Sequence, residues 1–156
     1  MSAPTITYIK KDITSIDFGI VAHGCNCQFK MGSGVAGAIR STWPLVYEEY
    51  MKLQPLYSDT HELLGRAQYI KIYDGLWVAN LFTQEFYGYE NKKYADEMAI
   101  YDAIKSTLAL AKEMELPVYI PKIGAGLGGL DWDTEVYPLL SRAVGETKVS
   151  LTVCEL

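Results

Sequence analysis

Two segments of the chain share the glycine spacing G-x-G-x-x-G, one at residues 32–37 and one at residues 124–129. Each segment follows an apolar run typical of a buried strand and precedes a stretch with helical composition. Because glycine reaches positive φ and has no Cβ, consecutive backbone N–H groups can close around an anion in such a loop. One loop of this kind is a weak signal. Two in 156 residues predict a ligand with more than one phosphate or ribose to hold.

A histidine stands between the first glycine segment and the strand before it. His23 ends the apolar run 19–23, where a parallel strand would deliver its side chain to the carboxyl edge of a sheet, the usual ligand crevice in α/β folds. An imidazole there could donate a proton to the ligand or accept one from it. The alternative is a buried histidine that bridges two loops, and both interpretations stay open. His61 stands in a polar stretch without a motif, so we expect it to be solvated.

Other motif-based chemistries fit the chain less well. A Rossmann site needs its first glycine at the end of the strand and an acidic residue about twenty positions later. Here nine residues separate the strand from Gly32, and the residue twenty positions after Gly32 is Lys52. No Gly-Lys-Ser/Thr follows either glycine segment, and no serine or cysteine stands in a nucleophile elbow. His23, Cys25 and Cys27 are residue types that bind metals, but on a tight segment we expect their side chains to point in different directions. No C-x-x-C pair, the usual spacing of zinc ligands, exists in the sequence. We therefore predict no metal site and no cofactor.

The composition is that of a globular protein without a strongly basic surface. Of the 156 residues 49% are hydrophobic and 21% are charged, and the net charge is −5. This charge argues against a broad surface for nucleic acid or anionic membrane, although loop amides can still attract an anionic small molecule. We expect no secretory signal and no membrane span, and the three cysteines favour reduced thiols. The expectation is one cytoplasmic, monomeric domain over residues 1–156.

The elements that position the glycine segments alternate between strand and helix patterns. Strands are predicted over residues 5–10, 19–23, 67–73, 76–82, 117–120 and 149–154. Helices are predicted over residues 34–40, 45–53, 94–115 and about 132–144, with a loop over 54–65. The turn Asp74-Gly75 marks a β-hairpin, and Trp43-Pro44 separates the first two helices. Mixed hairpin and β-α-β signals predict an α/β fold with a mixed sheet between helices.

Four segments, in chain order, resemble those of the macro domain family. The family's Gly-Asp-Ile-Thr element is similar to residues 11–14 (KDIT), with lysine in place of glycine. Its first ligand loop is similar to residues 23–36 (HGCNCQFKMGSGVA), and its second, pyrophosphate-holding loop to residues 121–132 (PKIGAGLGGLDW). Residues 77–84 (WVANLFTQ) look like the strand and loop between them. The resemblance leans toward the branch of the yeast-type ADP-ribose 1″-phosphate phosphatases and the terminal ADP-ribose glycohydrolase, which shares Ala-His at the end of the strand before the first loop.

The resemblance implies a three-layer α/β/α macro domain with a central mixed sheet that binds ADP-ribose between the two glycine segments. It implies that Asp12 accepts a hydrogen bond from the adenine amine, that the backbone of Ile13 supports the ring, and that Asn26 reaches the distal ribose. Asp12 could instead cap a turn, and Asn26 could satisfy its own backbone. The remaining implied ligand-binding residues are Gly32, Ser33, Gly34, Val35, Ala36, Asn80, Gly124, Ala125, Gly126, Leu127 and Gly128.

The resemblance also implies a reaction at the distal ribose. The predicted activity is metal-independent release of phosphate from ADP-ribose 1″-phosphate, with His23, Asn26 and Asp131 as the catalytic candidates. Asp131 could position a water, or it could cap the helix that begins at Trp132. Two other functions stay open: a hydrolase that removes ADP-ribose from modified protein or nucleic acid, and a non-catalytic ADP-ribose reader.

The chain departs from the family at three places. The first glycine segment contains no acidic residue, and Gly128 stands where the terminal glycohydrolase branch has an aspartate. A lysine adduct that depends on that aspartate is therefore disfavoured. Cys154 stands near the position where family members often carry an aromatic residue that stacks on adenine. We expect stacking to come from elsewhere, and a candidate flap comprises Phe86, Tyr87 and Tyr89.

Overall fold

The computed structural model describes residues 3–88, 92–125 and 128–156. Within these ranges the strands are β1 (Ile6–Lys10), β2 (Gly19–Asn26), β3 (Ala67–Tyr73), β4 (Leu76–Gln84), β5 (Val118–Ile120) and β6 (Leu151–Glu155). The helices are α1 (Gly34–Thr42), α2 (Pro44–Met51), α3 (Glu97–Met114) and α4 (Tyr137–Thr147). Short 3-10 turns are η1 (Ile13–Ser15), η2 (Gln54–Leu56) and η3 (Thr60–Leu63), and a π-helical turn, η5 (Trp132–Val136), leads into α4.

The strands form one mixed sheet in the order β1-β6-β5-β2-β4-β3. Every neighbouring pair from β1 to β4 is parallel, and β3 alone among the described strands runs antiparallel, in a hairpin with β4. The carboxyl ends of β1, β6, β5, β2 and β4 therefore share one edge of the sheet. Ligands of open α/β sheets bind outside this edge. Both glycine segments begin there, one after β2 and one after β5.

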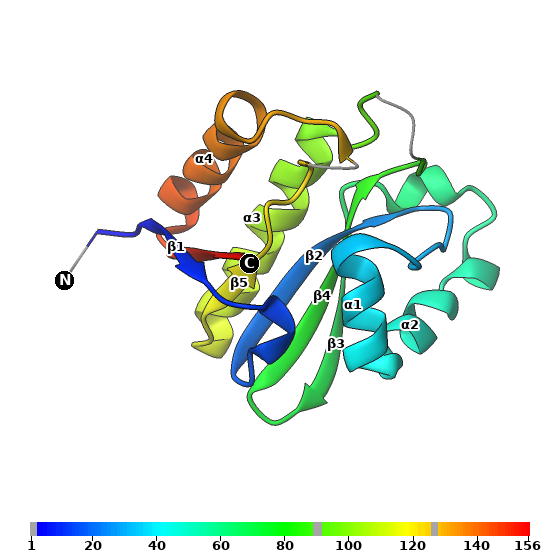
Figure 1. Ribbon diagram of the computed structural model, residues 1–156, viewed down its shortest axis with the longest axis horizontal. Coiled ribbons are helices and arrows are strands. Elements are labelled where there is room, and N and C mark those ends of the chain that lie inside the picture. The colour runs from blue at the N-terminus through cyan, green and yellow to red at the C-terminus, as the bar shows by residue number, and fades with distance from the viewer. Residues whose placement is uncertain (1–2, 89–91, 126–127) are drawn as a thin grey trace.

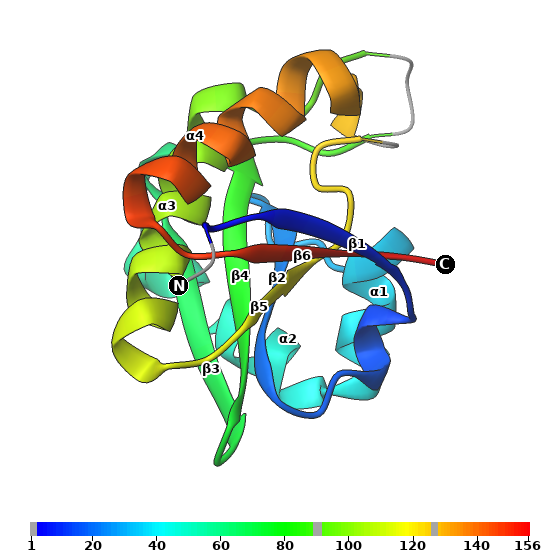
Figure 2. The same cartoon turned by 90° about the vertical axis from the view of Figure 1, so that its left-hand side faces the viewer.

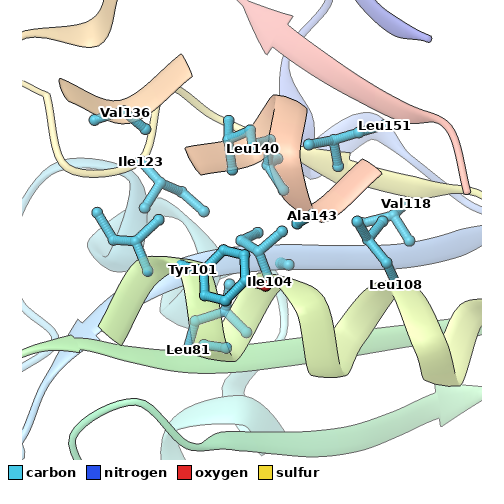
Figure 3. Close-up of a cluster of buried hydrophobic side chains, with 14 of the residues drawn as sticks. Leu81, Tyr101, Ile104, Leu108, Val118, Ile123, Val136, Leu140, Ala143 and Leu151 are labelled. Atoms are coloured by element: carbon cyan, nitrogen blue, oxygen red, sulfur yellow. The ribbon is translucent and has the colours of Figure 1, made fainter. Parts of the chain in front are cut away.

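Two helical layers cover the two faces of the sheet (Figure 1), with α1 and α2 on one face and α3 and α4 on the other. On the second face, Ile104 and Leu108 of α3 pack with Leu140 of α4 and with Val118 and Leu151 of the sheet (Figure 3). Burying each such side chain contributes about 1.5–3 kcal/mol relative to exposure. This α/β/α arrangement confirms the predicted fold class.

The ends of α3 follow local signals. The Asp96 carboxylate accepts a hydrogen bond from the Ala99 N–H at 2.8 Å, which makes Asp96 the N-cap. At the other end Glu115 has a left-handed conformation with φ of 56°, which closes the helix. The helix therefore starts three residues later than the predicted range 94–115, because its cap lies inside that range.

A difference from the sequence prediction that affects the site concerns β2. The predicted strand ends at His23, whereas β2 continues to Asn26 and stays paired with β4. Gly24 and Asn26 are residues that usually interrupt a strand pattern, but here the parallel neighbour β4 extends to Gln84 and continues the ladder beside them. His23 consequently lies inside the strand rather than at its end.

Candidate functional site

A cavity of about 800 Å³ lies at the carboxyl edge of the sheet. Its volume falls in the range typical of small-molecule sites. Figure 2 shows the end of β6 and the helix α1 on the same side of the molecule, where they contribute to the walls. The lining residues are Gly24, Cys25, Asn26, Lys30, Gly32–Ala36, Thr83, Gln84, Tyr87, Gly88, Pro121–Ala125, Gly128 and Cys154–Leu156.

The first glycine segment places the amino terminus of α1 at this cavity. Ser33 is the N-cap, and its hydroxyl makes no capping hydrogen bond. Gly34 has φ of +61°, which an L side chain rarely adopts. A Cβ at Gly32 would meet nothing within 4 Å, so this glycine borders open space. The first N–H groups of a helix have no intrahelical partner and favour an anion, so this wall can hold a phosphate.

The second glycine segment is shaped by its contacts with the rest of the fold. Gly124 has φ of +81°, and a Cβ there would lie 2.9 Å from the Ile100 side chain. A Cβ at Gly129, whose φ is +80°, would meet the backbone of Lys92. Gly128 accepts hydrogen bonds through its carbonyl from the N–H groups of residues 94 and 95. The predicted phosphate contacts Gly126 and Leu127 lie outside the described residues.

His23 and Asn80 lie behind the cavity and do not line it. Their side chains are 1% and 0% exposed, and His23 Nε2 lies 2.6 Å from Asn80 Oδ1. Asn80 donates through Nδ2 to Gln68, and Gln68 donates to the Glu49 carbonyl oxygen in α2. Burial lowers the pKa of His23 to about 4, which the bond to Asn80 only partly opposes. The imidazole is therefore neutral near pH 7, and the geometry favours the buried interpretation.

Cys25 stands between this buried network and the cavity. It lines the cavity, and its Sγ lies 3.6 Å from both His23 Nε2 and Asn80 Oδ1. Burial raises the pKa of the Cys25 thiol well above its usual value. An uncharged thiol is a poor nucleophile, so we assign Cys25 a packing role.

Asn26 lines the cavity, but its side chain serves its own loop. Its Oδ1 accepts hydrogen bonds from the backbone N–H groups of Gln28 and Lys30, at 3.0 and 3.2 Å, and from the Tyr50 hydroxyl at 3.1 Å. Its Nδ2 donates to the Lys30 carbonyl oxygen at 2.8 Å. These contacts favour the turn interpretation over a contact with the distal ribose.

The two predicted aspartates both act as caps, and neither lines the cavity. Asp12 accepts hydrogen bonds from the N–H and hydroxyl of Thr14 at 2.9 and 2.7 Å. Asp131 accepts the same pair of bonds from Thr134, both at 2.9 Å, and its own N–H donates to Glu135. Hydrogen bonds to the threonine lower the pKa of each aspartate. Asp131 thus has the geometry of a helix cap.

Asp12 nevertheless stays close to one end of the cavity. Cys154 lines that end, and burial raises the pKa of its thiol. The N–H of Lys11, the residue before Asp12, donates to the carbonyl oxygen of Glu155, another lining residue, at 2.8 Å. Ile13, beside Asp12, is buried in the core on the α1 side. Adenine recognition at this end stays a prediction.

Several lining residues lie inside the segments that carry the resemblance, but no ligand role was predicted for them. Thr83 is 1% exposed, and its hydroxyl makes no hydrogen bond to another described residue. Lys122 pairs with Glu155 at 2.9 Å, and Lys30 is an exposed cation on the opposite wall. Thr83 lies at the register shift between β2 and β4, where Gln84 and not Thr83 pairs with Asn26. A Cβ on Gly24 would approach the Thr83 Oγ1 to 2.7 Å.

The candidate aromatic flap is divided between two hollows. Tyr87 is 48% exposed and lines both the cavity and a neighbouring hollow of about 610 Å³. Phe86 lines only the neighbouring hollow, and Tyr89 lies outside the described residues. His61 is exposed, as expected, and its Nδ1 lies 2.9 Å from Glu85 Oε2 in that hollow. Of the two described flap residues, Tyr87 is the one that reaches the cavity.

Neither a metal cluster nor a membrane helix is found in residues 3–88, 92–125 and 128–156. In these ranges no three side chains of His, Cys, Asp or Glu are grouped to hold a metal ion. No helix there is both long and apolar enough to cross a membrane.

A mixed α/β/α sheet with a cavity between two glycine segments defines a class of ligand-binding domain. The macro domain family model matches residues 22–136, and the chain belongs to this family. A 17.5 kDa protein from the tk-vs intergenic region of Enterobacteria phage T4 is 34% identical over 132 residues, which cover 82% of this chain and 83% of the phage protein.

An enzyme and a solved structure are also similar to the chain. The ADP-ribose 1″-phosphate phosphatase of Meyerozyma guilliermondii is 30% identical over an alignment of 156 positions. This alignment covers 82% of this chain and 88% of the enzyme. The structure of a macrodomain protein from Streptomyces coelicolor is 27% identical with a TM-score of 0.79, and the match covers 97% and 99% of the two chains.

Proposed function

We propose that this macro domain binds ADP-ribose and removes the phosphate from ADP-ribose 1″-phosphate. The observation that carries the proposal is the cavity of about 800 Å³ between the two glycine segments, with the amino terminus of α1 in its wall. The similarity to the Meyerozyma guilliermondii phosphatase supports the choice of reaction.

In this proposal the diphosphate lies against the first turn of α1, where backbone N–H groups and the helix dipole favour an anion. The adenine lies at the β6 end of the cavity, near Cys154 and Asp12, because residues 11–14 resemble the adenine-binding element. The distal ribose then lies at the opposite end, beside Thr83, Gln84 and Tyr87, which also line the cavity.

The proposed reaction adds a water oxygen to phosphorus and breaks the bond from phosphorus to the anomeric oxygen, which leaves with a proton. The products are inorganic phosphate and ADP-ribose. His23 positions the ends of β2 and β4 instead of transferring a proton, because its Nε2 is bound to Asn80 and it does not line the cavity. Thr83 and Gln84 orient the phosphate and the water, and the substrate phosphate itself accepts the proton.

One observation favours a second candidate function, a non-catalytic ADP-ribose reader. The side chains of His23, Asn26 and Asp131 are all hydrogen-bonded within the fold. A reader needs the phosphate and ribose contacts of the cavity but no group that transfers protons. A hydrolase that removes ADP-ribose from a macromolecule needs the same contacts and access for that macromolecule.

The deciding experiment measures phosphate release from ADP-ribose 1″-phosphate, beside ADP-ribose release from a modified protein and from a modified DNA. We expect turnover of the first substrate. Release only from a macromolecule would identify the other hydrolase, and binding without any turnover would identify the reader.

A matched pair of variants tests the cavity itself. Gly32→Glu puts a carboxylate into the cavity, whereas Gly145→Glu puts one on α4, and a Cβ at either position meets nothing within 4 Å. We expect calorimetry to show that Gly32→Glu weakens ADP-ribose by more than about 3 kcal/mol, because a like charge faces the diphosphate. Gly145→Glu should bind as the wild type does. Equal affinity in both variants would contradict the proposed site.

A further inference from the structure

The charges of the cavity wall are unevenly distributed. Among the described lining residues the charged side chains are Lys30, Lys122 and Glu155. Lys122 Nζ lies 2.9 Å from Glu155 Oε1, so these two charges offset each other at the wall formed by β5 and β6. Lys30 makes no ion pair with another described residue and stands on the loop after β2. Among the described charged side chains of the wall, Lys30 is therefore the one without an ion-pair partner, in a protein of net charge −5.

The backbone of Lys30 is fixed from two sides by one side chain. The Lys30 N–H donates to Asn26 Oδ1 at 3.2 Å, and the Lys30 carbonyl oxygen accepts from Asn26 Nδ2 at 2.8 Å. The Tyr50 hydroxyl donates to the Asn26 carbonyl oxygen at 2.5 Å. Because Tyr50 belongs to α2, this helix fixes the backbone of Asn26, the residue that binds Lys30. Such double attachment leaves little freedom for the loop to move at this position.

The neighbours of Lys30 anchor it further. Phe29 is 3% exposed and Met31 is 2% exposed, whereas Lys30 between them is exposed. Phe29 has φ of +61°, a conformation that is unusual for a bulky residue, and its ring packs 5.2 Å from the Tyr50 ring. A strained residue persists where its surroundings over-determine it, and such residues cluster at ligand sites. Here the strained turn buries both neighbours and directs Lys30 to the rim of the cavity.

We propose that Lys30 is the residue that selects a phosphomonoester on the distal ribose over an unmodified ribose. This inference rests on the proposed function, because it assigns one residue to the group that distinguishes ADP-ribose 1″-phosphate from ADP-ribose. A phosphomonoester carries close to two negative charges near pH 7, and an ammonium group binds phosphate as a point charge. The loop after β2 is bound to the end of β4, because the Cys27 N–H donates to the Gln84 carbonyl oxygen at 3.1 Å. Lys30, Thr83 and Gln84 all line the cavity, and the proposal places the monoester beside them.

The test compares Lys30→Gln, Lys30→Arg and Lys71→Gln. Lys71 is a matched exposed lysine whose strand partner is Trp77, near the start of β4, so it lies far from the carboxyl edge. The readouts are KM and kcat for ADP-ribose 1″-phosphate, and the calorimetric Kd of ADP-ribose. If the wild type binds without turnover, the Kd of each ligand replaces the kinetic constants.

We expect Lys30→Gln to raise KM for the phosphorylated ligand by roughly 10- to 100-fold, the effect of losing one charge-assisted contact. The Kd of ADP-ribose should change by less than about threefold, and added salt should weaken the wild-type preference because the contact is exposed. Lys30→Arg should keep the preference, and Lys71→Gln should match the wild type.

Three results would overturn the inference. An unchanged KM in Lys30→Gln would show that the lysine does not contact the monoester. An equal loss for both ligands would assign Lys30 to the diphosphate or to the loop structure instead, and the proposed function would stand. A wild type that binds neither ligand would refute the proposed function, and the inference would fall with it.

Discussion

The two glycine segments have the same spacing but different physical reasons for their glycines. In the first segment a Cβ at Gly32 would enter open space beside the cavity, and the segment runs directly into α1. In the second segment a Cβ at Gly124 would meet Ile100, and one at Gly129 would meet the backbone of residues 92 and 93. In the first segment Gly32 and Gly34 border open space, and Gly37 alone packs closely, against the backbone of Gly32. The described glycines of the second segment would all bring a Cβ against other parts of the protein, although Gly124 and Gly128 also line the cavity.

This difference shows that one sequence pattern can border a cavity with open space in one place and pack against the protein in another. A shared motif therefore predicts the backbone shape of a loop more safely than it predicts which atoms the loop contacts. Variants of the two segments should fail in different ways, and the following predictions use that contrast, from the largest expected effect to the smallest.

The sharpest contrast is between Gly129→Ala and Gly32→Ala. A Cβ at residue 129 would lie 2.9 Å from Lys93 Cα, and φ there is +80°. We expect the free energy of unfolding to fall by about 3 kcal/mol or more, because both the contact and the conformation are unfavourable. Gly32→Ala should stay within about 0.5 kcal/mol of the wild type. Urea denaturation measures both, and equal losses would abolish the distinction between the two segments.

The free energy of unfolding should depend on pH through His23, which lies in β2, the strand before the first glycine segment. Its pKa is lowered to about 4 in the fold, against about 6.5 in an unfolded chain. Between these values the unfolded chain binds more protons, so stability is complete above pH 6.5 and is lost as the pH falls toward 4. The loss approaches about 3 kcal/mol.

The comparison is between urea denaturation at pH 7 and at pH 4.5, for the wild type and for His23→Gln. The variant removes this titration, so its stability should fall less between the two pH values. If the two proteins lost the same stability, the buried and neutral assignment of His23 would be wrong.

The end of the second segment should show a smaller, purely structural effect. Asp131→Ala removes the hydrogen bonds to Thr134 at the start of η5. We expect a loss of about 1 kcal/mol in unfolding free energy, typical of an N-cap, with turnover nearly unchanged. A variant that melts normally but turns over slowly would instead support the water-positioning role.

Much of the fold could be predicted because its signals are local. Alternation marked the hairpin of β3 and β4, and the Asp74-Gly75 turn joins them as predicted. The glycine spacing located the two cavity walls for the same reason. The fold class is confirmed, while the ligand contacts of Asp12 and the glycine segments stay predictions.

The roles of individual side chains could not be predicted because they depend on register and on distant partners. Three extra residues in β2 move His23 from the strand end into the sheet, where Asn80 binds it. Nothing in the sequence around Asn26 shows that Tyr50 and Lys30 would use its side chain. Thr83 lines the cavity at the register shift between β2 and β4, a feature that depends on both strands and not on the residues around Thr83 alone.

The place of β6 in the sheet has a consequence for how the protein is made. Among the described strands, β1 is joined to the sheet only through β6. Residues 151–155 of β6 pair with β1, and Thr152 and Val153 pair with β5 on the other side. During synthesis β1 leaves the ribosome before β6, and it lacks its one described sheet neighbour until residues 151–155 have emerged. Its unpaired edge is exposed for that interval, which makes nascent chains of this protein candidates for chaperone capture.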